Sequence, residues 1–83
     1  MVISSLIIKG QYLFLGTMGD GIWIANLNNP REIKPLSGTK KLNSKNIYQL
    51  IFDADGNLWV GTEKGVNKII IDANTSMLDV FFF

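Results

Sequence analysis

The chain has 83 residues, enough for one small domain. Because 47% of them are hydrophobic and only 18% are charged, a disordered chain is excluded, and we expect some apolar surface to face another subunit or another part of a larger protein. The formal net charge is +1 and no basic run is longer than Lys40-Lys41, so no nucleic-acid partner is expected.

Cysteine and histidine are absent, which excludes disulfides and removes the commonest general base and metal ligand. No apolar run approaches the ~18 residues of a membrane span, so we expect no membrane contact by this segment. Residues 1–5 lack the basic and long apolar regions of a signal peptide. The chain enters its first predicted strand almost at once and ends within its last, so we expect both ends to be cuts in a longer protein.

The first half of the chain alternates apolar runs with turn residues, a pattern typical of short β-strands. Loop residues 18–21 include glycines suited to positive φ, and residues 28–30 (Asn-Asn-Pro) predict a turn. Because Pro35 has no N–H, the last strand of this half is expected at a sheet edge. The four predicted strands are Ile3–Ile8, Tyr12–Thr17, Ile22–Leu27 and Glu32–Leu36.

The second half repeats this arrangement after a polar, loop-like stretch at residues 37–45. A turn is predicted at residues 72–74, before the last strand. No segment keeps a 3.6-residue period, so the chain is predicted to be all-β. The predicted strands are Ile47–Phe52, Asn57–Thr62, Val66–Ile71 and Met77–Phe83.

An internal repeat relates the two halves at a spacing of 44 to 45 positions. The matching pairs are Ile3 and Ile47, Gly16-Thr17 and Gly61-Thr62, and Gly21 and Gly65. A repeat of this length with four strands is typical of a β-propeller blade. We therefore predict one β-propeller fragment over residues 1–83, with one four-stranded blade at about 1–40 and a second at about 41–83.

The predicted strands are nearly continuously apolar, as in sheets that are covered on both faces. Two blades leave two outer faces without a neighbour, whereas a propeller closes its ring with about 4–8 blades. We therefore expect either a homo-oligomer formed through the blade faces or completion of the ring within a longer protein.

Residues 47–71 resemble the two-component regulator propeller repeat, which combines an acidic turn, a Leu-Trp strand ending in Gly-Thr, and a further Gly before an apolar residue. The first copy departs from this pattern, because Lys9-Gly10-Gln11 replaces the acidic turn and Phe14 replaces the Trp. The matching positions are Asp53, Gly56, Leu58, Trp59, Gly61, Thr62, Gly65 and Val66.

Proteins with this repeat are typically hybrid two-component sensors of gut-type Bacteroidetes, with periplasmic propellers that respond to polysaccharide fragments. The resemblance implies that this chain is a periplasmic fragment of such a ligand-sensing region, with a possible oligosaccharide ligand. The chain contains no kinase residues, so no catalytic activity of its own is expected. Two alternatives are a structural or protein-interaction scaffold and a self-assembling sugar-binding lectin.

The acidic turn Asp53-Ala54-Asp55-Gly56-Asn57 has the Asp-x-Asp spacing found in calcium loops. An EF-hand loop requires a Glu at its twelfth position, and here that position is Lys64. The first copy makes the corresponding turn without a carboxylate. We interpret this segment as a hairpin turn and expect no metal and no cofactor.

The two Gly-Thr pairs, Gly16-Thr17 and Gly61-Thr62, lack the Lys-Ser/Thr and the helix that a phosphate-binding loop requires. We expect each glycine to permit close backbone approach and each threonine hydroxyl to cap nearby backbone groups. The sequence Asn74-Thr75-Ser76 is interpreted as a turn rather than a glycosylation acceptor.

Aromatic side chains can stack on sugar rings, but Trp59 lies within an apolar strand and is predicted to be buried in the core between the blades. Trp23 follows a glycine-rich loop and, with Asp20, is the predicted ligand-binding candidate. The carboxylates lie mostly at turns, with no nucleophile or paired base among them. The sequence therefore predicts no enzyme, including no propeller lyase.

Overall fold

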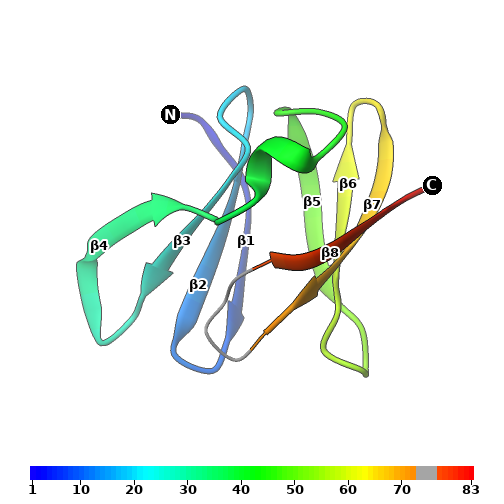
Figure 1. Cartoon of the computed structure of the whole chain (residues 1–83). Helices are drawn as coiled ribbons and strands as arrows, with labels where there is room; N and C mark the ends of the chain where they lie inside the picture. The colour runs from blue at the N-terminus through cyan, green and yellow to red at the C-terminus, as the bar shows by residue number, and fades with distance from the viewer. Residues whose placement is uncertain (73–76) are drawn as a thin grey trace.

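Eight strands form two four-stranded antiparallel sheets in the computed structural model, which describes residues 1–72 and 77–83 and the side chains of all of these except 77 and 78. The sheets lie side by side (Figure 1). The first contains β1 (Ile3–Lys9), β2 (Tyr12–Thr17), β3 (Ile22–Asn26) and β4 (Asn29–Pro35) in that order, and the second contains β5 (Ile47–Phe52), β6 (Leu58–Thr62), β7 (Gly65–Ile71) and β8 (Met77–Phe82).

These strands confirm the predicted all-β class and the edge position of the strand that contains Pro35. The turn before β4 differs from the prediction, because Asn29 and Pro30 already belong to that strand. The side chain of Asn26 accepts a hydrogen bond from the backbone N–H of Asn28 at 2.9 Å, so the turn is made one step earlier. The predicted turns at 72–74 and 74–76 fall largely or wholly outside the described residues.

A short 3₁₀ helix, η1 (Thr39–Lys41), lies in the segment that joins the two sheets and was not predicted from the sequence. The described residues contain no helix long and apolar enough to cross a membrane.

The core lies between the inner faces of the two sheets, where β1 and β2 pack against β5. Phe14 and Phe52 meet across this interface in an edge-to-face arrangement, with ring centroids 5.4 Å apart. The buried members of the core are Phe14, Ile22, Ile24, Leu36, Ile47, Leu50, Leu58, Val60 and Ile69.

Trp59 does not belong to this core, so the prediction that it is buried between the blades is wrong. Side chains alternate between the two faces of a strand, and in β6 the inner positions are taken by Leu58 and Val60. Trp59 therefore lies half-buried on the outer face, where its ring stacks on Phe83 with centroids 5.4 Å apart.

Each sheet is covered on one face only, which agrees with the expectation that two blades leave two outer faces without a neighbour. Leu6 and Ile8 of β1 are exposed on the outer face of the first sheet, and Ile51 is exposed on that of the second. Every residue of β4 is exposed, because this strand forms the edge of the first sheet and is not packed against the second.

Gly16 permits a close approach between the sheets. A methyl group built at Gly16 would lie 2.7 Å from Cγ2 of Ile47, closer than two carbon atoms can pack. Two serines of β1 reinforce this contact: the Ser4 hydroxyl donates to the Ile47 carbonyl oxygen, and Ser5 Oγ accepts from the Leu50 N–H at 3.2 Å. The missing side chain at Gly16 thus lets polar groups of β1 reach the backbone of β5.

Gly16→Ala should destabilise the fold by about 1–3 kcal/mol, because the added methyl overpacks the contact with Ile47. Gly61→Ala is the matched control, since the nearest atom to a methyl there is 3.9 Å away, at ordinary contact distance. Urea unfolding of both variants at high dilution provides the measurement. Equal losses for the two variants would show that the Gly16 contact has no special importance.

Candidate functional site

Three connecting segments meet at one end of the two sheets, the upper end in Figure 1, and we call them the loop edge: residues 18–21, 38–46 and 63–64. The carbonyl oxygen of Lys45 accepts hydrogen bonds from the N–H groups of Gly19 and Gly21 at 3.1 and 3.0 Å. The carbonyl oxygen of Asn46 accepts one from Glu63 N–H at 3.2 Å. The segment between the sheets is therefore held by the turns of both.

Two buried threonines shape the turns of the loop edge in the same way. The Thr17 hydroxyl donates to the Gly21 carbonyl oxygen at 2.6 Å and accepts from the Asp20 N–H at 3.0 Å. In the second sheet the Thr62 hydroxyl donates to the Gly65 carbonyl oxygen at 2.9 Å and accepts from Lys64 N–H at 3.1 Å. The Gly-Thr repeat is thus a device that closes the turn after the second strand of each sheet.

Gly21 brings η1 against the first sheet. Its φ is +73°, and a methyl there would lie 2.7 Å from Thr39 Oγ1. That hydroxyl oxygen accepts a hydrogen bond from the Ile22 N–H at 2.9 Å. Glycine at this position therefore allows the backbone conformation and leaves room for Thr39.

Two cavities open on the loop edge, of about 160 and 370 Å³, and they share Thr39, Lys40 and Lys45. The smaller cavity is also lined by Asp20, and the larger by Asn43, Asn46 and Glu63 among others. Hydroxyl, amide, carboxylate and ammonium groups supply both donors and acceptors of hydrogen bonds. Such a set is suited to a polar ligand with many hydroxyl groups or with negative charge.

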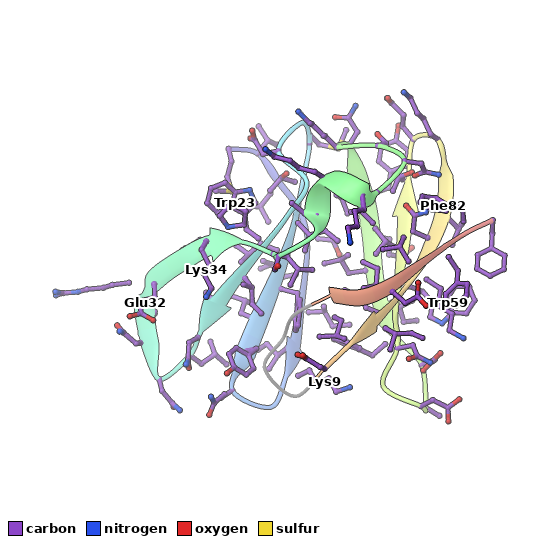
Figure 2. All side chains as sticks on the ribbon, viewed as in Figure 1. Lys9, Trp23, Glu32, Lys34, Trp59 and Phe82 are labelled. Atoms are coloured by element: carbon purple, nitrogen blue, oxygen red, sulfur yellow. The ribbon has the colours of Figure 1, made fainter. Side chains whose placement is uncertain are left out.

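Of the two candidate ligand-binding residues, only Asp20 lines a cavity of the loop edge. Asp20 is exposed and lines the smaller cavity, whereas Trp23 does not line it. The half-buried indole of Trp23 donates from Nε1 to the Asp20 carbonyl oxygen at 3.0 Å and so holds the loop (Figure 2). Trp23 is therefore a positioning residue for the loop that carries Asp20.

Sequence reasoning missed Lys40 and Lys45, which accompany Asp20 at the cavity. They lie in a stretch that looks like an ordinary polar loop. Their meeting with Asp20 depends on η1 and on the hydrogen bonds to the Lys45 carbonyl oxygen, which no local pattern indicated.

The acidic turn lies at the opposite end of the second sheet, and Asp53 organises it. Asp53 Oδ1 accepts hydrogen bonds from the N–H groups of Asp55 and Asn57 at 2.9 and 3.0 Å, and Oδ2 accepts one from Trp59 Nε1 at 2.8 Å. These bonds stabilise the carboxylate, chiefly the one from Trp59, and lower the pKa of Asp53. Among the residues that the structure describes, no three acidic side chains gather as a metal site would require.

The lowered pKa gives the stability of the chain a defined dependence on pH. The charged form of Asp53 stabilises the fold fully above its usual pKa of 3.8, and this contribution is lost as pH falls through the lower pKa of the folded state. Asp53→Asn should therefore be less stable than the wild type at neutral pH, and the difference should shrink in acid. Urea midpoints measured across this pH range provide the test.

Trp59→Phe is the companion variant, because it keeps an aromatic ring against Phe83 but removes the indole donor. The pKa of Asp53 should rise in this variant, and its acid-sensitive range should move upward. A stability difference between wild type and Asp53→Asn that stays constant from neutral pH to below 3.8 would contradict this role for Asp53.

Comparison with known proteins agrees with the repeat seen in the sequence and in the sheets. Residues 41–64, which include β5 and β6, match the family model of the two-component regulator propeller. No curated protein matches the chain. The chain therefore contains a two-component regulator propeller repeat at residues 41–64, and its two four-stranded sheets correspond to two propeller blades.

Proposed function

We propose that this chain is part of the ligand-sensing propeller region of a periplasmic two-component sensor and that the loop edge binds a carbohydrate fragment. The match of residues 41–64 to the two-component regulator propeller supports the sensor role. The observation that carries the binding role is the pair of adjoining cavities that share Thr39, Lys40 and Lys45.

The chemistry of these cavities favours a polyhydroxylated ligand. Asp20 and Glu63 accept hydrogen bonds from sugar hydroxyls, and the lysine ammonium groups donate to hydroxyl or carboxylate oxygens. Lys40 and Lys45 line both cavities, so an acidic sugar would be preferred over a neutral one of the same size.

The position of the site also allows its conformation to change when a ligand binds. Its walls come from both sheets and from the segment between them, joined by backbone hydrogen bonds to the carbonyl oxygens of Lys45 and Asn46. A ligand that draws these segments together would shift the chain toward the conformation that binds it better. In this proposal the chain senses its ligand and performs no chemistry on it.

A protein-interaction scaffold is the second candidate function, and the apolar outer faces of the sheets favour it. Leu6, Ile8 and Phe83 are 59%, 61% and 69% exposed. Exposed apolar surface of this kind is typical of sites that bind other proteins. A scaffold would use these faces and would have no need of the loop edge.

Titration calorimetry with a panel of neutral and acidic oligosaccharides tests the proposed binding site. We expect measurable binding to at least one acidic member, and a loss of about tenfold or more in affinity for Lys45→Ala, which removes a charged hydrogen bond. Glu32→Ala, an exposed change on β4 away from the loop edge, is the control and should bind as the wild type does (Figure 2).

Two results would contradict the proposal. Binding that is unchanged in Lys45→Ala would place the ligand elsewhere on the chain. The absence of binding to every member of the panel by the folded chain would favour the scaffold.

A further inference from the structure

The two outer faces of the molecule lie on opposite sides, away from the core between the sheets. We define the leading face as the outer face of the first sheet, formed by Ile3, Leu6, Ile8 and Leu13. We define the trailing face as the outer face of the second sheet, formed by Trp59, Gly61, Val66 and Phe83. Figure 2 shows Trp59 beside β8, far from the first sheet.

The leading face repeats the surface that the second sheet buries. Ile3, Leu6 and Ile8 stand 44 positions before Ile47, Leu50 and Phe52. Ile47 and Leu50 are only 0% and 5% exposed, because the first sheet covers them. Their counterparts Ile3 and Leu6 are 41% and 59% exposed. The first sheet therefore presents a contact surface of the same kind without a partner.

The trailing face repeats the surface with which the first sheet covers the second. Strand pairing relates Trp59 to Phe14 and Val66 to Ile22, since each stands at the same register position of its sheet. Phe83 corresponds to Leu36: Leu36 N–H donates to the Ile22 carbonyl oxygen at 2.9 Å, and Phe83 N–H donates to that of Val66 at the same distance.

Burial differs sharply between these equivalent positions. Ile22 and Leu36 are 0% and 1% exposed, whereas Val66 and Phe83 are 38% and 69% exposed. The molecule thus contains one complete interface between sheets and, on its two outer faces, the two unmatched halves of a second.

We propose that, when the 83-residue chain is on its own, the trailing face of one copy docks on the leading face of another, in the place that a neighbouring blade would take in a longer protein, and reproduces the contact between the two sheets. The contact is heterologous, because two different surfaces meet, so it generates rings or open filaments rather than an isologous dimer. A ring of 4–8 blades would need two to four copies, since each copy supplies two blades.

Gly61 gives the proposed interface a specific contact. It is the counterpart of Gly16, whose missing side chain admits Ile47. Within the described part of its own molecule nothing requires a glycine at this position, because the nearest atom to an added methyl is 3.9 Å away, and its φ is not positive. In the assembly, Gly61 would admit Ile3 of the neighbouring copy.

The equivalence has two departures: Lys68 stands where the first sheet has Ile24, and Tyr48 and Gln49 stand where it has Ser4 and Ser5. The ammonium group of Lys68 lies 5.5 Å from the centroid of the Trp59 ring, so its alkyl stem can pack while the charge stays at the edge. Lys9 already behaves in this way at the interface within the chain: it lies 4.7 Å over the Phe52 ring and donates to the Gly56 carbonyl oxygen at 3.0 Å.

Light scattering of the 83-residue chain tests the proposal first. We expect the wild type at micromolar concentration to have a mass of several times 9.3 kDa, decreasing on dilution. Gly61→Ala should fold with unchanged circular dichroism and shift to the mass of a single chain. Glu32→Ala, an exposed change on β4 outside both faces, should associate as the wild type does.

Complementation of two blocked variants then tests the head-to-tail geometry. Leu6→Lys blocks the leading face and Phe83→Lys blocks the trailing face, and each alone should be monomeric. Mixed in equal amounts, they should form a heterodimer and nothing larger, because each retains the one face that the other needs.

Three results would overturn the proposal. One is a wild-type chain that stays monomeric at every concentration that can be reached. Another is a Gly61→Ala chain that associates as the wild type does. A third is a Leu6→Lys or Phe83→Lys chain that still pairs with itself, which would indicate an isologous contact between like faces.

Discussion

The structure depends on how closely β2 approaches β5 at Gly16 and Ile47. A side chain at Gly16 would hold the sheets apart, since even a methyl group there would lie 2.7 Å from the Ile47 side chain. The approach lets Ser4 and Ser5 bind the backbone of β5 and lets Phe14 reach Phe52. Without it, neither sheet would have a covered face, and the apolar side chains that form the core would be exposed to water.

The loop edge follows from the same contact. Once the sheets are packed, the turn after β2 and the turn after β6 are close enough to share hydrogen bonds with Lys45 and Asn46. The threonines Thr17 and Thr62 fix each of these turns from within its own sheet. The residues that line the cavities, among them Asp20 and Lys40, are therefore brought together by the backbone hydrogen bonds of these turns.

Most of the fold could be predicted from the sequence, because strand signals and the repeat are local properties. The spacing of Gly16-Thr17 and Gly61-Thr62 placed equivalent strands in equivalent positions. The prediction for Trp59 was wrong because one face of a blade packs on the opposite face of the next, so the equivalents Phe14 and Trp59 have different surroundings. The candidate site was only partly predictable. Asp20 follows from its glycine-rich loop, whereas Lys40 and Lys45 join it through the tertiary arrangement of η1.

The packing of the two blades depends on a bare glycine of the first that admits an isoleucine of the second. The nuclear Overhauser effect between glycine α protons and isoleucine γ2-methyl protons measures this most directly, with isotope filtering to separate contacts within a chain from contacts between chains. We expect a strong signal from Gly16 to Ile47 within the chain and, in the proposed assembly, one from Gly61 to Ile3 between chains. A folded chain whose Ile47 methyl shows no signal to Gly16 would contradict this packing.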